Sequence, residues 1–229
     1  MAVRRLIVAR GRGGRALERL LALAREKKVP ITFERREAVG AKAGARAHQG
    51  VVGLVEPPGY VELEEVLKRL EGLKRPAFLL ILDGIQDPQN LGALIRTAAT
   101  FGVDGVILAE HRACGLTPAV YKASAGAVEW VPVARVVNLP RALDIIKGRG
   151  IWVVGTDPKA EVLIYKWDFS LPTALVLGSE GRGLSRLVAE RCDVKVAIPM
   201  VDNVASLNVS SAGASAMYEV IRQRGGPGG

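Results

Sequence analysis

Three short segments of the chain combine polar side chains with small residues in a way that suits a ligand site. In the segment 198–213, an apolar strand leads through a proline into a helix whose first turns are almost all small or polar. A helix that only filled a core would carry larger apolar side chains, because these bury more area. Ser206 and Asn208 lie near its start, where unpaired backbone N–H groups gather. We therefore expect either a ligand or another segment of backbone to approach this helix closely.

The other two segments place polar residues beside a strand end. In the segment 83–96, Pro88 suits the first turn of a helix, and Asn90 and Arg96 are close enough along that helix to share one side. In the segment 177–184, Glu180 lies in a glycine-rich turn. The alternatives are an ordinary capped helix with a surface arginine, and a carboxylate favoured by a helix dipole. The glycine-rich turn lacks the dinucleotide fingerprint, the P-loop and the nucleophile elbow, which disfavours an NAD-linked oxidoreductase and a serine hydrolase.

The positive charge of the chain is concentrated at one end. The 229 residues include 32 Lys and Arg and 23 Asp and Glu, of which 13 and 4 fall in residues 1–50, so that 19 of each remain in residues 51–229. All of the net charge of +9 therefore lies in the first fifth of the chain. This asymmetry indicates a module that binds a polyanion, joined to a neutral part. The alternative is a solvated basic face that only aids solubility.

Other aspects of the composition exclude several classes of protein. Cys114 and Cys192 lack metal-ligand spacing and are interpreted as reduced structural thiols, and only two histidines are present, so we expect no metal site. No apolar run is long enough to span a membrane, and the first ten residues do not resemble a signal peptide. The sequence thus favours a cytoplasmic protein. With 49% hydrophobic residues, it can bury a substantial core in one or two domains.

The pattern of elements predicts two α/β parts with a linker helix between them. The first, residues 1–60, contains predicted strands at 3–9, 29–33 and 51–55, a helix at 15–28, and a helix or loop at 35–45. A helix at 62–73 lies in a linker, residues 61–76. From residue 77, short apolar strands (78–82, 105–108, 130–134, 151–155, 173–177 and 194–198) alternate with helices (90–101, 139–147, 184–191 and 206–224). Such alternation predicts a parallel sheet covered on both faces, with ligands at the carboxyl ends of its strands.

These segments together resemble the SpoU family of RNA ribose 2′-O-methyltransferases, within the SPOUT class. The resemblance spans about residues 77–220 and rests on the segments 90–96, 124–133, 177–183 and 198–210. It implies an α/β catalytic domain, residues 77–229, whose chain forms a deep trefoil knot. Residues 1–60, with the segment 48–51 as the best local match, resemble the family's L30e-like substrate-binding domain, although they start late relative to it. Asp202 departs from the glycine that is common in the family.

The resemblance also implies a cofactor and a set of site residues. S-adenosylmethionine would be held by six residues: Thr156, Leu177, Gly178, Ile198, Met200 and Leu207. The catalytic residues would be Asn90, Arg96, Glu180, Ser206 and Asn208. In the family this arginine is often proposed as the base. Because an arginine side chain stays protonated, we expect Arg96 instead to bind the target phosphate and to stabilise developing oxyanion charge.

The substrate and partners implied by the resemblance are RNA and a second copy of the chain. The candidates for phosphate contacts lie in the basic first part: Arg10, Arg12, Arg15, Arg35, Arg36 and Arg46. The preferred target is a guanosine of 23S rRNA. The alternatives are a tRNA 2′-O-methyltransferase and a knotted RNA-binding protein without activity. Relatives are homodimers through the knotted domain, so a homodimer is expected here too.

Overall fold

A computed structural model of the chain describes residues 3–43, 49–55, 59–201 and 206–226. The chain divides into two compact units, Met1–Pro58 and Gly59–Gly229. Two residues named above, Arg46 and Asp202, lie outside the described residues. In the described part of the chain, no helix is both long and apolar enough to cross a membrane.

The first unit is a three-stranded sheet with one helix on each face. Its strand order is β2-β1-β3, with β1 parallel to β2 and antiparallel to β3. Successive residues of a strand point to opposite faces, so Leu6 and Val8 pack with α1 while Ile7 packs with α2. The elements are β1 (Val3–Ala9), α1 (Arg15–Glu26), β2 (Ile31–Glu34), α2 (Arg36–Ala43) and β3 (Val51–Val55).

The second unit is built on a seven-stranded sheet in the order β6-β5-β4-β9-β7-β10-β8. All of its strand pairs among the described residues are parallel, which confirms the predicted parallel sheet. The strands are β4 (Phe78–Asp83), β5 (Gly105–Ala109), β6 (Val133–Val136), β7 (Trp152–Thr156), β8 (Val162–Leu163), β9 (Thr173–Gly178) and β10 (Val194–Ala197). The α-helices are α3 (Leu63–Leu70), α4 (Pro88–Thr100), α5 (Pro118–Ala123), α6 (Leu139–Lys147), α7 (Arg186–Arg191) and α8 (Val209–Gln223).

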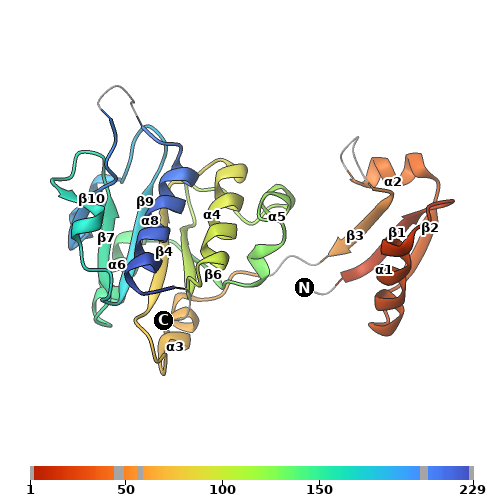
Figure 1. Cartoon of the computed structure of the whole chain (residues 1–229), viewed down its shortest axis with the longest axis horizontal. Coiled ribbons are helices and arrows are strands. Elements are labelled where there is room, and N and C mark those ends of the chain that lie inside the picture. The colour runs from red at the N-terminus through yellow and green to blue at the C-terminus, as the bar shows by residue number, and fades with distance from the viewer. Residues whose placement is uncertain (1–2, 44–48, 56–58, 202–205, 227–229) are drawn as a thin grey trace. The chain divides into compact units, whose positions relative to one another are not determined.

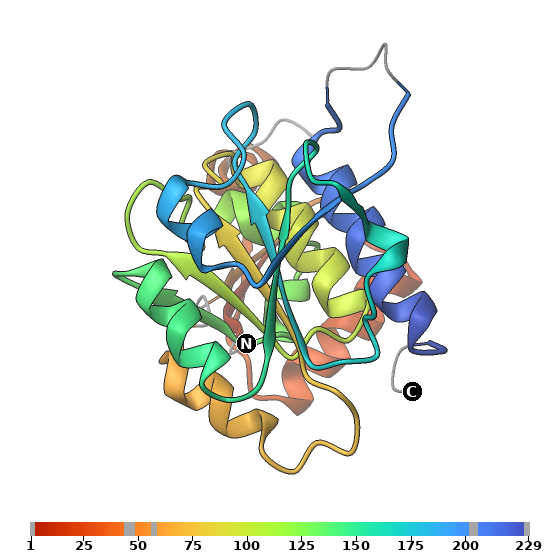
Figure 2. The same ribbon diagram turned by 90° about the vertical axis from the view of Figure 1, so that its left-hand side faces the viewer.

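Helices cover both faces of this sheet. Helices α4 and α8 lie side by side on one face with α5 next to α4, whereas α3, α6 and α7 cover the other face (Figure 1, Figure 2). On β4, Leu80 and Leu82 belong to the first of these cores, while Leu79 and Ile81 belong to the second. Helix α3, which falls in the predicted linker, therefore packs as part of the second unit. Burial on both faces explains why these strands are continuously apolar.

Several predicted boundaries were wrong, for local reasons. Helix α8 begins at Val209 rather than at residue 206, because the Asn208 side chain accepts hydrogen bonds from the N–H groups of the first turn. Strand β6 begins at Val133 rather than at residue 130, because a 3₁₀ turn at Ala127–Glu129 occupies the preceding residues. Helix α7 begins at Arg186, two residues late. The short elements α5 and β8 were not predicted, since neither is long enough to show a period.

Arg224 connects the end of α8 to the strand edges. Its guanidinium donates hydrogen bonds of 2.8–3.3 Å to four backbone carbonyls, those of Pro76, Ala77, Phe169 and Leu171. Burial lowers the pKa of Arg224 to about 10, so the group remains charged at neutral pH. Replacing Arg224 with alanine removes one donor from each of these four carbonyls, and Ala77 and Leu171 keep a hydrogen bond from Thr173. We expect the free energy of unfolding, measured by urea denaturation, to fall by about 2–3 kcal/mol.

Arg186 offers a control for Arg224. It lies on α7, and its guanidinium pairs with Glu190 at 2.6 Å, with both side chains exposed. The Arg186→Ala variant is expected to change stability much less, because exposed ion pairs contribute little. Equal losses in the two variants would show that the carbonyl contacts of Arg224 are not what stabilises the end of α8.

Candidate active site

Three polar side chains from separate elements meet in one hydrogen-bonded cluster. Asn208 donates through Nδ2 to Glu180 Oε1 at 2.6 Å and to Asn90 Oδ1 at 3.1 Å. Asn90 donates through its own Nδ2 to Glu180 Oε1 at 3.1 Å. The Val209 N–H adds a fourth bond, to the same carboxylate oxygen, at 3.3 Å. The structure therefore brings together three of the five residues predicted to be catalytic.

Each member of the cluster is positioned by its own element. Asn90 lies in the first turn of α4, which the Asp87 carboxylate caps through the N–H groups of Gln89 and Asn90. Glu180 follows β9 in a tight loop that is closed by two backbone hydrogen bonds between Ser179 and Gly183, of 3.0 and 2.9 Å. Asn208 caps α8. Two helix N-termini and one strand end thus converge on a single point.

Gly178 makes the loop after β9 possible. A Cβ atom at this position would overlap the backbone of Gly183 and Leu184. A larger residue would therefore push this loop away from the strand, and Glu180 with it. We conclude that the glycine-rich composition of the segment 177–184 reflects close backbone packing as much as access for a ligand.

The small residues of α8 have a packing role as well. A Cβ atom on Gly213 would overlap Leu94 Cδ2 and lie 2.7 Å from Leu177 Cδ1. Leu94 and Leu177 belong to α4 and β9, so α8 packs closely against both elements. The close approach expected at this helix is therefore made, at Gly213, by neighbouring leucine side chains.

Arg96 and Ser206 do not join the cluster. Six residues correspond to about 1.7 turns of helix, so Arg96 lies about a third of a turn around α4 from Asn90, and the expectation of a shared side was wrong. Asn90 is buried, whereas Arg96 is exposed and its side chain makes no hydrogen bond or ion pair with the described residues. Ser206 is exposed and lies two residues before Asn208.

Two pockets flank the start of α8. The larger, with a volume of about 600 Å³, is formed by the loops after β4, β5 and β9, and both Asn90 and Glu180 line it. The smaller, of about 100 Å³, is lined by Thr156, Asp157, Pro158, Val196, Ile198, Met200, Ser206, Leu207 and Ala212. The smaller pocket thus gathers four of the six residues predicted to bind the cofactor, together with Ser206. Leu177 and Gly178 are buried in β9 and do not line it.

Five of the six arginines predicted to contact RNA lie at or just beyond the carboxyl ends of β1 and β2, a place called here the arginine edge. Arg10, Arg12 and Arg15 follow β1, while Arg35 and Arg36 follow β2, its parallel neighbour. The Arg10 N–H donates to the Glu34 carbonyl at 2.8 Å, which holds the two strand ends together. All five side chains are exposed. Their contact with RNA remains a prediction.

Sequence reasoning missed several residues that line the larger pocket. Arg112 follows β5, and Arg182 lies in the loop that carries Glu180. The rule that ligands bind at the carboxyl ends of parallel strands would have drawn attention to Arg112, had it been applied to β5. Arg182 lies within the recognised segment 177–184, but nothing in its type distinguishes it from a surface arginine.

Comparison with known sequences gives a consistent result over both units. Residues 77–218 match the SpoU rRNA Methylase family, and residues 1–61 match the family described as RNA 2′-O ribose methyltransferase substrate binding. The chain is 44% identical over 226 residues to the 23S rRNA (guanosine-2′-O-)-methyltransferase RlmB of Pseudomonas putida, covering 97% of this chain and 89% of that protein. It is also 44% identical to the putative TrmH family tRNA/rRNA methyltransferase YacO of Bacillus subtilis, covering 90% and 83% respectively.

Solved structures show the same similarity. The SpoU methyltransferase AviRb from Streptomyces viridochromogenes, in complex with the cofactor AdoMet, matches with a TM-score of 0.82 and 28% identity, over 97% of this chain and 83% of that one. The TrmH/SpoU tRNA modifying enzyme of A. aeolicus matches with a TM-score of 0.60 and 33% identity, over 71% of this chain and 84% of that one.

Proposed function

The chain belongs to the SpoU rRNA methylase family of RNA methyltransferases, and we propose from this that it methylates the 2′-hydroxyl of a guanosine ribose in 23S rRNA. The methyl donor in this proposal is S-adenosylmethionine. The observation that carries it is the cluster of Asn90, Glu180 and Asn208 between two pockets, in a chain whose two units match the two parts of this family. The proposal includes a cytoplasmic location, because ribosomal RNA is there.

The smaller pocket suits part of S-adenosylmethionine. Its wall is mostly apolar, from residues such as Val196, Ile198 and Leu207, with Thr156 and Asp157 as polar groups. Ligand sites usually combine an apolar wall with a few fixed polar groups and occupy ~300–1,000 Å³, so the 100 Å³ seen here would hold a portion of the molecule. When bound, this cofactor supplies a methyl group on a sulfonium, which is a good leaving group.

The residues of the chain would then align and stabilise the reacting hydroxyl. The ribose would lie at the cluster, between the smaller pocket and the larger one, where the second Nδ2 hydrogen of Asn90 can orient the 2′-oxygen for in-line attack while the hydroxyl proton passes to water. Asn208, whose amide donates to Glu180 and Asn90, would keep Asn90 in position. Glu180 holds both amides in place. Arg96 is exposed and without a partner among the described residues, so it is available to bind the target phosphate and to stabilise negative charge on the oxygen.

The identity of the target is tested by mapping 2′-O-methyl groups in RNA. Total RNA from a strain that lacks this gene is expected to have lost one methyl group, on a guanosine of 23S rRNA, and the purified protein is expected to restore it in vitro. A methyl group lost from tRNA would instead favour the tRNA alternative, and no transfer to any RNA by folded protein that binds the cofactor would leave only an RNA-binding function.

The first unit is proposed to bind RNA phosphates through its arginine edge. Replacing Arg12 and Arg35 together with alanine is expected to weaken binding of a 23S rRNA fragment. It should also reduce the slope of log K against log salt concentration by about two, because each phosphate contact releases close to one counterion. Filter binding at several salt concentrations measures both quantities.

A double variant with the same change in charge provides the control. Arg19 and Arg25 are exposed on α1, outside the loops that follow β1 and β2 and carry Arg12 and Arg35. Replacing Arg19 and Arg25 with alanine should leave the salt slope nearly unchanged. Equal effects from the two double variants would mean that total charge, and not the arginine edge, determines RNA binding.

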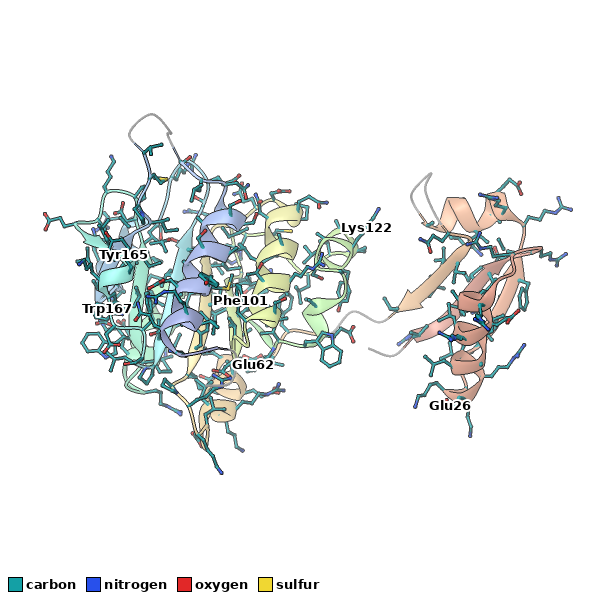
Figure 3. All side chains as sticks on the ribbon, viewed as in Figure 1. Glu26, Glu62, Phe101, Lys122, Tyr165 and Trp167 are labelled. Atoms are coloured by element: carbon teal, nitrogen blue, oxygen red, sulfur yellow. The ribbon has the colours of Figure 1, made fainter. Side chains whose placement is uncertain are left out.

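We also propose that the protein is a homodimer through its second unit. The support is an aromatic pair at this face of the unit: Phe101, which follows α4 and is labelled in Figure 3, has its ring 6.4 Å from that of Tyr218 on α8, and Tyr218 is 56% exposed. Light scattering coupled to size exclusion measures the mass directly. A monomer at micromolar concentration would contradict this part of the proposal.

A further inference from the structure

The larger pocket contains three carboxylates, and each is already held by the protein. Asp83 accepts a 2.7 Å hydrogen bond from the Ser185 N–H. Asp87 caps α4 with both of its oxygens, and Glu180 is the acceptor at the centre of the cluster. The acidic groups of this pocket are therefore engaged in holding its own walls, since each receives donors from neighbouring elements.

The cationic groups of the same pocket are in the opposite situation. Arg112 and Arg182 line it from different loops, and neither side chain makes a hydrogen bond or ion pair with any described residue. His111 lies beside Arg112 and is likewise without a described partner. Beside the acceptor capacity that remains on Asp83 and Glu180, the pocket therefore offers a ligand the donors of two guanidinium groups, which are best matched by a group with adjacent acceptors.

The two arginines are attached to loops that the fold holds in place. The loop after β5 is fixed to the loop after β4 by a 2.7 Å hydrogen bond from the Cys114 N–H to the Ile85 carbonyl. Arg112 has a φ of 62°, a left-handed conformation that a residue with a side chain rarely adopts. Arg182 lies in the loop closed by Ser179 and Gly183. Anchoring of the backbone reduces the entropy that these loops lose when their side chains bind a ligand.

We propose that this pocket receives the base of the target nucleotide, and that Arg112 and Arg182 recognise the acceptor edge of guanine. This inference rests on the proposed function. Asn90 and Glu180 belong both to the cluster and to the wall of this pocket, so a ribose at the cluster places its attached base in or beside the pocket. The volume of about 600 Å³ is ample for a nucleobase taken out of its stack.

Guanine is the base that best matches these donors. Its O6 and N7 atoms are adjacent acceptors, and the planar fork of arginine bonds both at once. A phosphate would also accept hydrogen bonds from arginine. The pocket, however, is walled by three loops beside the cluster, whereas phosphates remain on the outside of an RNA strand. We therefore place the base in the pocket and treat phosphate binding as an outcome of the test.

The test combines variants of the protein with variants of the base. A 23S rRNA fragment that contains the mapped target is made with guanosine, 7-deazaguanosine, which lacks the N7 acceptor, or 2-aminopurine, which lacks O6. With wild-type protein, we expect kcat/KM for methyl transfer to fall about 5- to 100-fold on at least one of the altered RNAs. In Arg112→Ala or Arg182→Ala, kcat/KM on the guanosine RNA should fall by a similar factor relative to wild type. In the same variant, changing the base should cause no further fall in kcat/KM.

The controls separate this inference from the proposed function. Arg141 is an exposed arginine on α6, outside the pocket. In Arg141→Ala, kcat/KM should fall on the altered RNA by the same factor as in the wild type. The Kd for S-adenosylmethionine and the melting temperature of all variants should match the wild type. Suppose that the wild-type protein methylates the guanosine, but kcat/KM of both arginine variants falls on the altered RNA as much as that of the wild type. The base contact is then refuted and the proposed function stands.

Two other results would also overturn the inference. Methylphosphonate substitution next to the target removes a phosphate charge. If it lowers kcat/KM for the wild-type protein but not for Arg112→Ala or Arg182→Ala, these side chains contact the RNA backbone and not the base. A mapped target that is not guanosine would refute guanine recognition. If no RNA is methylated at all, the proposed function itself fails, and the inference fails with it.

Discussion

Replacing Arg96 with alanine is expected to lower kcat for methyl transfer by about 10²–10³-fold while the Kd for S-adenosylmethionine stays within about twofold. The loss should be large because a charged donor that stabilises developing negative charge acts mainly in the transition state. Cofactor binding should survive because Arg96 lies on α4 and does not line the smaller pocket. The melting temperature should also change little, since the side chain is exposed and makes no bond with the described residues. Single-turnover transfer of a labelled methyl group and calorimetric titration measure the two effects.

Arg96→Lys and Arg141→Ala are the companion variants for this experiment. Lysine keeps the charge but lacks the planar fork of arginine, so partial activity is expected. Arg141→Ala removes an equally exposed arginine from α6 and should have full activity. Parallel losses of catalysis and cofactor affinity in Arg96→Ala would refute the assigned role.

The second large effect is expected for Glu180→Gln, with a fall in kcat of about 10²-fold. One carboxylate oxygen of Glu180 accepts from Asn90, Asn208 and the Val209 N–H. The amide is nearly isosteric, but it has one acceptor oxygen instead of two and no charge. It would hold the two asparagine side chains less firmly in the geometry that the reaction needs. KM for RNA should change much less than kcat.

Glu190→Gln provides the matched control for this substitution. Glu190 lies on α7 and pairs with Arg186 at the surface, away from the cluster. Its substitution should leave kcat unchanged. The folded state of Glu180→Gln is checked by its melting temperature, which should stay close to that of the wild type. Unchanged kcat in folded Glu180→Gln would show that the carboxylate only supports the structure of the loop.

Local sequence patterns predicted the second unit well because its strands are buried on both faces. The run 78–82 has no polar residue, and such runs bounded by helices are typical of parallel sheets. Helix starts were predicted less well. Asn208 shows why, because its side chain caps α8 and the helix begins only at the next residue. The residue type alone does not distinguish a capping residue from a residue within the first turn.

The pairing of site residues could not be obtained from spacing along the chain. Asn90 and Arg96 lie on one helix, yet the turn of that helix separates them, while Asn90 meets Glu180 and Asn208 from elements about 90 and 118 residues away. The parallel order of β4 and β9 places the loops after these two strands side by side. Spatial order in the sheet differs from order in the sequence, so local pattern cannot supply this contact.

The sequence by itself determined the two α/β units, the basic character of the first, and the family, because motif residues, strand runs and charge are properties of the chain. Only the tertiary structure decided which motif residues touch. It also showed that each carboxylate of the larger pocket accepts a hydrogen bond from a neighbouring element, while the side chains of Arg112 and Arg182 have no partner among the described residues. Whether a polar group has a partner depends on which elements the fold brings to it, and residue type alone cannot reveal that.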